Sequence, residues 1–572
     1  MMKSMKHLIL TVCAILSVNV ALFGYTSPAE KKLIYFGWCC PRTAEELLKT
    51  DIGEFDAHCP FDGIGIYPVV TIQRDGKTVS YNPAWSAGNP PLLKWEDFQE
   101  MVPALRRLQE TRLKHNFIRS NCSVFNGNWF DDEAWKRTLN CYSLLARLAK
   151  EAGFEGLCLD LEGYPYTKMP FKFHPEYGHT FEETAAQVRK RGKEWIEELN
   201  RQYPDLTLFT FLWSTCDTPY QAAHPEMFST GRDALLEAFY NGVYDGAPET
   251  MKIVDGQETR GYCASTDMDY ERIVSLYHRF GDAWIDKANC DKYKKITSMG
   301  ISLYLDSYVK KNKPTRWDHH NPLFPDLTEL LAHNVANSLS HADEYVWIWC
   351  ENGTFWPGAV FSKNDKTTFK FWDESIPHCT EAIRFGRDWA KGLTPATGKN
   401  IVRNGAMEPG KNGSAAGPEQ KESGILEWSS WQAGRTPKGT IVPENGMVRF
   451  VNVTEGSISQ SFDSVKAGKK YILMARCKNE SSVSTPQLGF FYRDSTGQGM
   501  WDMQEYGFFT EKEADGWSRG TMRITVPDGR DITQLTITVG VSGEQDPSGK
   551  DKGVLFDDAA LYEVEYPWEK KE

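Results

Sequence analysis

Acidic residues stand at the ends of several short apolar runs, and the clearest case is the segment 156–164, GLCLDLEGY. It follows a helical pattern that stops at Gly153, so it predicts a buried parallel strand. Side chains alternate across a strand, which places Cys158, Asp160 and Glu162 on the face opposite the leucines. Carboxyl groups in such a place are costly to desolvate. Acid/base or nucleophilic chemistry would account for them.

Eight apolar runs of this kind alternate with helical patterns over residues 33–351. Alternating strands and helices indicate right-handed βα units and a parallel sheet. Eight units over about 360 residues predict a (β/α)8 TIM barrel with long loops. The main alternative, an open doubly wound sheet, lacks its Gly-rich phosphate loop after the first strand. The predicted strands are 33–38, 61–67, 116–121, 156–164, 206–213, 251–255, 298–306 and 345–351.

The carboxyl ends of barrel strands meet at one rim, where barrel enzymes carry their active sites. Alternation along the strands predicts an acidic cup with aromatic walls at this rim. Far more acids than bases gather there, which a structural ring of ion pairs does not explain. The expected substrate-binding residues of the barrel are Tyr67, Asn121, Tyr164, Trp213, Tyr304, Trp347 and Trp349. The candidate catalytic residues are Glu162, Asp160, Glu351, Asp255, Glu258 and Asp306.

Carboxyl pairs of this kind suit the hydrolysis of glycosidic bonds. One protonated acid serves the leaving oxygen, and one carboxylate acts as nucleophile or as base for water. Different surroundings give the two groups different pKa values and therefore different roles. We interpret Glu162 as the general acid/base, with Asp160 tuning it. The second carboxylate stays open among Glu351, Asp255, Glu258 and Asp306.

The Asp-x-Glu pair at 160–162 resembles the end of the fourth strand in family 18 chitinase-like barrels. In that family the Glu is the acid, and the Asp helps an N-acetyl group of the substrate act as nucleophile. The full family pattern, Asp-x-x-Asp-x-Asp-x-Glu, would need Asp where this chain has Glu155 and Cys158. The layout of strands four, six and eight is similar to uncharacterised bacterial glycosidase-type barrels and covers residues 30–390.

The remaining composition narrows the class of protein. A net charge of −12 argues against a nucleic-acid partner. Lys3 and Lys6 followed by an apolar stretch predict a signal peptide over residues 1–27, and therefore a secreted or periplasmic protein. No later segment is apolar enough to insert into a membrane after signal removal. Neither zinc-ligand spacings nor a Gly-x-Ser-x-Gly elbow occurs, so we expect no catalytic cofactor.

A second, all-β domain follows a stretch rich in Gly and Pro, which divides the chain into a barrel over residues 28–396 and a β-sandwich (jelly-roll) over residues 397–566. Short alternating runs separated by turn residues predict the sandwich. We expect a chain ending near Thr397 to fold alone and to keep activity on small substrates. The predicted sandwich strands are 447–453, 470–477, 487–492, 520–526, 535–541 and 554–564.

The two ends of this region, 400–408 (NIVRNGAME) and 556–562 (FDDAALY), resemble family 4/9/22-type carbohydrate-binding modules. The resemblance implies a structural Ca²⁺ held by Glu408 and by Asp557 or Asp558, since oxygen ligands suit this hard cation. Tyr492 and three tryptophans are the candidate sugar platforms or, equally, core residues. The tryptophans are Trp428, Trp431 and Trp501.

Together these features predict a secreted glycosidase acting on a polysaccharide or oligosaccharide. Two alternatives stay open. The chain could be a non-catalytic glycan-binding protein with a degenerate barrel. It could also be another polysaccharide-active enzyme such as a lyase, which would use Tyr304 or Arg119 to abstract a proton and to neutralise a uronate.

Overall fold

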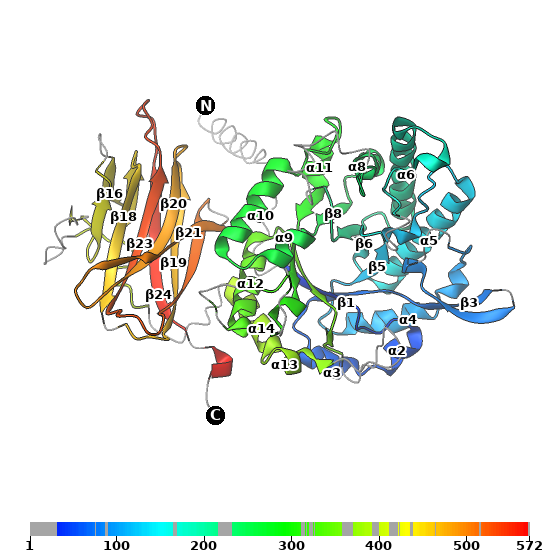
Figure 1. The fold of residues 1–572 in the computed structure, drawn as a ribbon, viewed down its shortest axis with the longest axis horizontal. Coiled ribbons are helices and arrows are strands. Elements are labelled where there is room, and N and C mark those ends of the chain that lie inside the picture. Colours follow the sequence, from blue (N-terminus) through cyan, green and yellow to red (C-terminus); the bar gives the residue numbers. More distant parts are fainter. Residues whose placement is uncertain are drawn as a thin grey trace, which may run out of the picture.

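The computed structural model contains a parallel α/β barrel and a C-terminal antiparallel sandwich, which lie side by side (Figure 1). It describes residues 31–569 except 75, 86–89, 164–168, 215–230, 311–314, 316, 320–323, 325, 357–369, 392–399, 411–420, 423, 435–438, 464, 514–515 and 565. The predicted signal peptide, residues 1–27, lies outside the described residues.

The barrel sheet has nine parallel strands in the order β10-β11-β1-β2-β5-β6-β7-β8-β9. Only Gly300 separates β9 from β10, so the two ends of this order adjoin and the sheet closes. All eight predicted strands are confirmed, the seventh being split into β9 and β10. The strands are β1 (Lys32–Gly37), β2 (Gly63–Ile66), β5 (Phe117–Asn121), β6 (Gly156–Asp160), β7 (Thr207–Thr210), β8 (Lys252–Asp255), β9 (Thr297–Met299), β10 (Ile301–Tyr304) and β11 (Tyr345–Cys350).

Helices surround the sheet (Figure 1). Capping boxes begin α2 at Thr43 and α6 at Thr180, and α5 ends at Gly153 in the left-handed conformation that glycine adopts freely. The described barrel helices are α2 (Ala44–Lys49), α3 (Ile52–His58), α4 (Met101–Arg106), α5 (Asp132–Ala152), α6 (Phe181–Gln202), α8 (Leu236–Gly246), α9 (Glu258–Cys263), α10 (Asp267–Phe280), α11 (Cys290–Ile296), α12 (Leu327–His341), α13 (Trp372–Ser375) and α14 (Cys379–Ala390).

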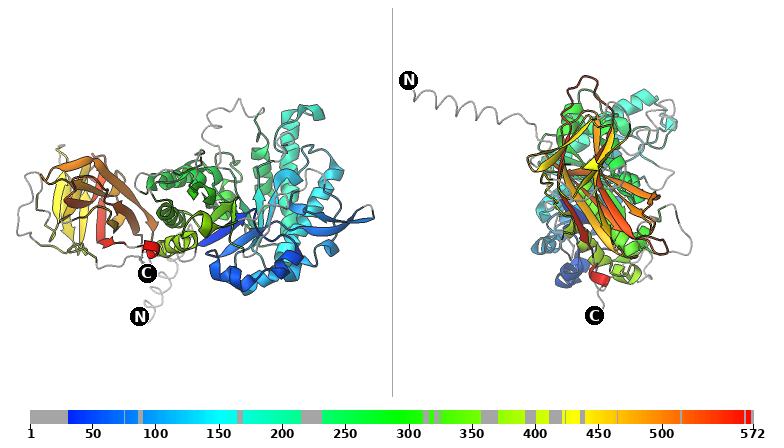
Figure 2. Two further views of the ribbon diagram at one scale, coloured as in Figure 1. Left: turned by 60° about the horizontal axis from the view of Figure 1, so that its bottom comes forward. Right: turned by 90° about the vertical axis from the view of Figure 1, so that its left-hand side faces the viewer.

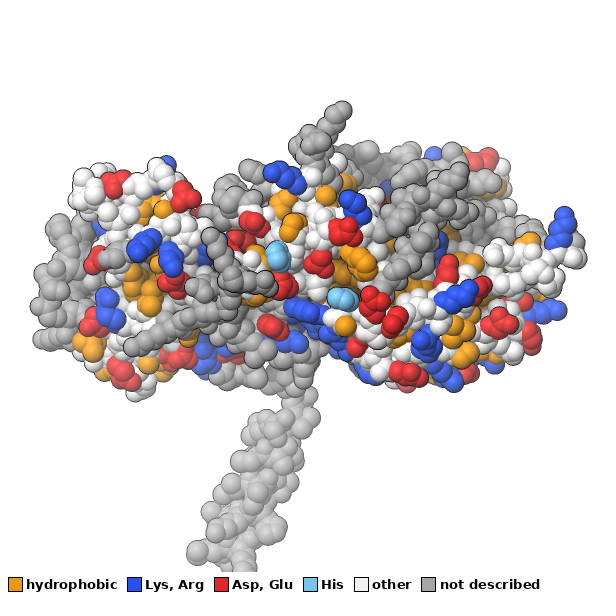
Figure 3. All heavy atoms as spheres, turned by 90° about the horizontal axis from the view of Figure 1, so that it is seen from below, with side chains coloured by type: hydrophobic (Ala, Val, Ile, Leu, Met, Phe, Trp, Pro, Cys, Tyr) orange, Lys and Arg blue, Asp and Glu red, His pale blue; other side chains and the backbone are white. Residues whose placement is uncertain are grey.

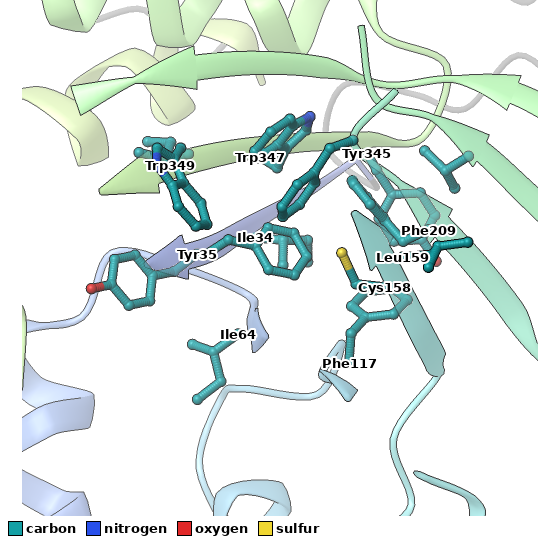
Figure 4. Close-up of a cluster of buried hydrophobic side chains, with 14 of the residues drawn as sticks. Ile34, Tyr35, Ile64, Phe117, Cys158, Leu159, Phe209, Tyr345, Trp347 and Trp349 are labelled. Carbon is teal, nitrogen blue, oxygen red and sulfur yellow. The ribbon is translucent and has the colours of Figure 1, made fainter. Parts of the chain in front are cut away.

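Aromatic rings fill the inside of the barrel. The ring of Phe209 lies 5.3 Å from that of Phe36, 5.4 Å from Phe117 and 5.8 Å from Tyr345. Figure 4 shows the side chains of Phe117, Phe209, Tyr345 and Cys158 converging from different strands. This layer is a packed core that closes the barrel beneath its rim, so polar chemistry is confined to the carboxyl ends of the strands.

The C-terminal region is an antiparallel sheet of eleven strands folded into a sandwich, as predicted. The long strand β21 pairs with β20 in one sheet and with β22 in the other. The order is β14-β15-β18-β23-β20-β21-β22-β19-β24-β17-β16. The strands that correspond to predicted runs are β17 (Met447–Val451), β19 (Lys470–Asn479), β20 (Ser484–Arg493), β22 (Ser518–Thr525), β23 (Gln534–Gly543) and β24 (Val554–Glu563). Those not predicted are β14 (Lys421–Glu422), β15 (Ser429–Gln432), β16 (Thr440–Glu444), β18 (Glu455–Asp463) and β21 (Gly499–Lys512).

The sandwich packs against the barrel helices through a substantial contact (Figures 1 and 2). The guanidinium of Arg523 lies 3.9 Å from the ring centre of Trp389 in α14 and 5.0 Å from that of Tyr566. Lys470 of β19 forms an ion pair with Glu329 of α12, and both side chains are largely buried. The sandwich is therefore fastened to the barrel by apolar, cation–π and ionic contacts together.

All eleven cysteines of the described part are free thiols, and nine of them are buried. Cys158 of β6 and Cys350 of β11 belong to this buried group. Burial raises the pKa of both thiols well above the usual range. The described region is thus held together without a disulfide.

The surface mixes charges of both signs. Figure 3 shows acidic and basic side chains interspersed on one face of both units. No helix within the described ranges is long and apolar enough to cross a membrane.

Candidate active site

Asp160 and Glu162 project from the end of β6 into the rim. Asp160 is buried, and its Oδ1 accepts a hydrogen bond of 2.9 Å from the backbone N–H of Glu162. Asn121 lies opposite Asp160 in the neighbouring strand β5, and its side-chain amide donates to the Glu162 carbonyl at 2.8 Å. These contacts fix the turn after β6, so the backbone that carries both acids is held on two sides.

Glu258 reaches the same rim by an unusual turn after β8. A Cβ at Gly256 would lie 2.4 Å from the Thr210 carbonyl oxygen, so only glycine fits there. Gln257 follows in the left-handed region, at φ 50°, which is uncommon for a residue with a side chain. Ser302 donates to the Glu258 carbonyl at 2.7 Å. Strained backbone held by its surroundings often marks functional sites, and here it places Glu258 at the start of α9.

The three acids influence one another's protonation. Burial, followed by the charge of Glu162, raises the pKa of Asp160 to about 7. Burial, then the charges of Glu162 and Asp160, raises the pKa of Glu258 well above its usual range. One carboxyl oxygen of Glu258, Oε2, is buried without a hydrogen-bond partner among the described residues. The rim therefore favours a neutral carboxyl at Glu258 near neutral pH.

A buried cation, Arg119 of β5, lies among the aromatic residues of the rim. Its side chain is fully buried and donates to the Gly37 carbonyl at 3.1 Å and to the Tyr67 hydroxyl at 3.0 Å. Its guanidinium lies 4.0 Å from the ring centre of Tyr67 and 4.4 Å from that of Trp349. Its charge lowers the pKa of Asp160 and Glu258, although burial outweighs this effect at both.

Aromatic residues form two groups at the rim. The first comes from β1, β2, β11 and the short turn at 83–85, and it contains Trp38, Tyr67, Trp85 and Trp349 in ring contact. In the second, Tyr262 stacks on Tyr304 with ring centres 5.1 Å apart. Sequence reasoning missed Trp38, Trp85 and Tyr262. Trp38 could have been found, because it shares the inward parity of Phe36 on the first strand.

Glu351 and Asp306 lie together beside Tyr304. Asp306 is buried and accepts hydrogen bonds from the Glu351 backbone N–H at 2.8 Å and from the Asn352 amide at 2.6 Å. The Trp349 indole donates to Glu351 at 3.1 Å. Burial, then the charges of Asp306 and Glu351, raises the pKa of Tyr304. These contacts give Asp306 a role in holding the turn after β11.

Three other candidate residues do not reach the rim surface. Trp213 is buried and donates to the Tyr244 hydroxyl at 2.9 Å, because β7 ends at Thr210 and the chain then turns toward α8. Asp255 ends β8 and is buried, and its charge adds to the burial that raises the pKa of Tyr244 in α8 and of Tyr293 in α11. Trp347 is buried below the rim, stacked on Phe211.

Tyr164 lies outside the described residues. The catalytic candidates that the structure brings together are therefore Asp160, Glu162 and Glu258 in one group and Asp306 and Glu351 in another.

The pKa of Asp160 implies a pH-dependent stability. In the unfolded chain this group titrates near pH 4, so the folded chain retains a proton that the unfolded chain loses between about pH 4 and 7. Stability should fall as the pH rises through that window, by about 1.4 kcal/mol for each pKa unit. We expect Asp160→Asn, which carries no charge, to melt above the wild type at pH 8 and to approach it at pH 5.

Calorimetry at both pH values tests this expectation. The exposed substitution Asp205→Asn is the control and should leave the pH dependence unchanged. An Asp160→Asn protein that gains no stability at pH 8 relative to pH 5 would contradict the raised pKa.

In the sandwich, exposed aromatic residues gather on one sheet face. Trp431, Trp501 and Tyr506 are 36%, 61% and 52% exposed, and the ring of Trp501 lies 4.8 Å from that of Phe491. The strand register puts small residues between them on this face, namely Ser457, Ser459, Ser461, Gly489, Thr536, Thr538 and Gly540. We call this set the aromatic face. Trp428 and Tyr492 are instead buried in the sandwich core.

A concavity of about 580 Å³ adjoins the aromatic face. Asp463, Gln534 and Arg493 lie in register across it, on the same side of the sheet as Phe491. Its lining offers charged and amide groups that can donate and accept hydrogen bonds.

The predicted calcium ligands come from the two ends of the C-terminal region, Glu408 from its start and Asp557 and Asp558 from its last strand, β24. Burial, then the charge of Asp558, raises the pKa of Asp557, and the charge of Glu408 adds to this. Asp558 forms an ion pair with Arg476 at 3.1 Å. Within the described part of the chain, no group of three or more His, Cys, Asp or Glu side chains is arranged to hold a metal ion. Glu408 and Asp557 remain close enough to interact.

Comparisons with known proteins give no family. No family model matches the sequence, and no curated protein matches it. The similar solved structures include the α-amylase of Geobacillus thermoleovorans in complex with acarbose, at 8% identity over 90% of this chain and 99% of that chain, with a TM-score of 0.35.

Other similar structures align with only part of the chain. A structure described as "CBM4 structure and function" matches at 19% identity over 28% of this chain and 99% of that one, with a TM-score of 0.20. A Clostridium thermocellum xylanase fragment containing CBM22-1 and GH10 modules, in complex with xylohexaose, matches at 14% identity over 26% and 28%, with a TM-score of 0.19. These scores carry no argument, so the fold assignment rests on strand order and register.

Proposed function

We propose that this protein is a glycoside hydrolase that cleaves a polysaccharide or oligosaccharide with two carboxyl groups of the barrel rim, Glu258 and Glu162. The observation that carries the proposal is the placement of the acids: Asp160 ends β6, Glu162 follows it, and Glu258 enters the same rim after β8 with its Oε2 buried. Burial and two nearby carboxylates favour a proton on Glu258, which suits an acid for the leaving oxygen. Glu162 would be its partner, acting as nucleophile or as base for water.

This assignment changes the role of Glu162. The sequence pattern suggested Glu162 as the proton donor, whereas the surroundings of Glu258 favour Glu258 as the proton donor. Asp160, whose Oδ1 accepts from the Glu162 backbone, would hold the turn and adjust the charge of the pair. The aromatic groups containing Trp38 and Tyr304 would flank the sugar rings. We propose no catalytic cofactor.

The full chain should be incubated with a panel of neutral and acidic plant, fungal and bacterial polysaccharides, with product sugars separated by chromatography. A double variant, Glu162→Gln with Glu258→Gln, serves as the blank. Release of reducing ends by the wild type and not by the blank supports hydrolysis. Unsaturated products would indicate a lyase instead, and glycan binding without any cleavage would indicate a degenerate barrel.

The sandwich is proposed to bind the glycan on its aromatic face. Exposed rings separated by small polar side chains leave room for sugars to stack and to hydrogen-bond. We expect Trp501→Ala to weaken retention on an insoluble glycan by roughly tenfold, since losing a stacked ring costs on the order of 1–2 kcal/mol. Affinity electrophoresis of the full chain measures it.

The control for Trp501→Ala is Leu92→Ala, which removes an exposed apolar side chain from the barrel, where Leu92 is 70% exposed. Retention that Trp501→Ala leaves at the wild-type level would remove the aromatic face from the binding site.

Two further parts of the proposal concern export and calcium. We propose that residues 1–27 are an export signal and that the mature chain is secreted or periplasmic. We also propose a structural Ca²⁺ at Glu408 and Asp557, with Asp558 released from Arg476 to join them. A melting curve with and without a chelator tests it, because a ligand that binds only the folded state stabilises that state.

A further inference from the structure

We propose that Arg119 is a positioning residue that sets how many protons the Asp160–Glu162–Glu258 cluster carries, acting through its fixed charge rather than through an ion pair. The inference rests on the proposed function for its biological meaning, since it explains how one acid stays protonated beside an ionised one. Its physical content concerns only the charges at the rim.

The burial of Arg119 is compensated without a carboxylate partner. No carboxylate oxygen of the described residues lies within 4.0 Å of its nitrogens, and Nε is buried without a hydrogen-bond partner among those residues. A buried cation normally requires an anion or several hydrogen bonds. Here aromatic faces supply part of the compensation through cation–π contacts. Rings within 6 Å of the guanidinium belong to Tyr67, Trp349, Phe211, Trp38 and Phe36.

The barrel backbone is shaped to receive this side chain. A Cβ at Gly65 of β2 would lie 2.1 Å from the Phe36 ring and 2.9 Å from the Arg119 Cγ, so the glycine leaves space for both side chains. The Gly37 carbonyl at the end of β1 accepts from Nη1, and the Tyr67 hydroxyl after β2 accepts from Nη2. Three strands therefore hold the guanidinium in one place, and it cannot swing toward a single acid.

Arg119 pairs in register with Cys158, two positions before Asp160 on the neighbouring strand β6, so its side chain and that of Asp160 lie on the same face of the sheet. A cation held in this place acts on several groups at once. Charge–charge interactions extend over several ångströms in a poorly solvated interior. Arg119 lowers the pKa of Asp160 and Glu258 and of the nearby Tyr67, Cys40 and Cys158. The titratable and charged groups around the cluster are Cys40, Tyr67, Arg119, Cys122, Cys158, Asp160, Glu162, Arg232, Asp233, Glu258 and Tyr262.

Among these described groups Arg119 is the buried cation, and it lies at the rim with three carboxyl groups, whereas Arg232 is exposed. The guanidinium charge of Arg119 stabilises the first carboxylate that forms among the three acids. Ionising a second acid is less favourable, because that acid is buried and is repelled by the first carboxylate. The cluster therefore holds an anion and a neutral acid together near neutral pH. That mixed state is what a hydrolase needs before substrate arrives.

The test compares Arg119→Met, which keeps most of the bulk, with Arg119→Lys, which keeps the charge. Infrared spectra recorded without substrate over a pH series follow the band of protonated carboxyl groups, assigned by its loss in Asp160→Asn and Glu258→Gln. We expect Arg119→Met to move these titrations upward by about 1–2 pH units. Arg119→Lys should move them much less.

Arg191→Met is the matched control. Arg191 is also buried, but it pairs with Asp132 and with Glu194 at 2.9 Å on the helical layer. Its loss should leave the rim titrations unchanged. A folded Arg119→Met protein with wild-type carboxyl titrations would overturn the proposal.

Tyr67→Phe covers the case in which Arg119→Met does not fold. It removes the hydrogen bond that holds Nη2 but keeps the ring and the charge, so the guanidinium can approach Asp160 and the titrations should move downward. Unchanged titrations in Tyr67→Phe would then count against the proposal. The spectra need no substrate. If the titrations shift as expected but the protein cleaves no glycan, only the proposed hydrolase function is contradicted. If the wild type cleaves a glycan but Arg119→Met leaves the titrations unshifted, only the role of Arg119 is contradicted.

Discussion

Replacing Glu258 by glutamine is expected to lower turnover on natural glycosides by about 10²–10⁴-fold, the range for a lost general acid. The amide cannot donate a proton to the leaving oxygen. An activated aryl glycoside has a leaving group that departs without a proton, so the variant should retain much more of its rate on that substrate. Turnover measured on both substrates, together with the melting temperature, separates lost acid catalysis from misfolding.

Glu162→Gln is the matched variant for this experiment. It should lose a comparable factor on natural and activated substrates alike, because attack at the sugar carbon fails in both. Glu351→Gln, also at the rim, should lose much less. A Glu258→Gln enzyme with near wild-type turnover on natural substrates, or a larger loss in Glu351→Gln, would move the pair to the other acidic group.

A chain that ends at residue 396 is expected to melt well below the full protein. The sequence alone suggested that such a chain folds independently, since all the rim acids precede this point. The structure adds what would be uncovered: Trp389 and Phe385 of α14 lose their contacts with Arg523 and Tyr566, which the truncation removes. Truncation would also leave Glu329, whose pKa is raised by burial, without Lys470. Glu329 would then face solvent, so the main loss is the burial of the two rings, and fully burying a side chain of this size contributes about 1.5–3 kcal/mol.

Calorimetry and an activity assay on a small soluble substrate together test the truncated chain. Trp568→Ala in the full chain is the smaller perturbation, because it removes one ring stacked on Tyr566 and keeps the sandwich in place. We expect the truncated chain to keep activity at low temperature and to lose it on mild heating. An unchanged melting temperature would show that the contact between barrel and sandwich contributes little.

The barrel could be predicted from sequence because its strands are short apolar runs between long amphipathic helices, and each helix has recognisable ends. The Asp160 and Glu162 pair followed from simple alternation, because β6 runs straight to its end. The same counting misplaced Trp213, since β7 ends three residues earlier and the backbone leaves the strand path. A strand's last hydrogen bond is set by its neighbours, which a single segment does not reveal.

Asp255 and Glu258 show a second limit. Ile253 and Val254 are both apolar, so the pattern cannot say which face of β8 points inward. The inward position is taken by Gly256, whose missing side chain lets Trp347 approach. The left-handed backbone at Gln257 then places Glu258 at the rim. The residue types in this segment do not predict such a conformation. In the sandwich, β18 and β21 were missed because serine and polar residues line their outer face.

The buried thiols constrain the way this chain must mature. Nine described cysteines end in the interior without a disulfide, although the proposed export would deliver the chain unfolded to an oxidising compartment. Before folding, those thiols are accessible and can be joined in pairs that the native packing does not accommodate. Once folded, their burial keeps them from ionising, and thiolate is the reactive form. Maturation is therefore a competition in time between collapse of the barrel and oxidation, and yield in a recombinant host should depend on which occurs first.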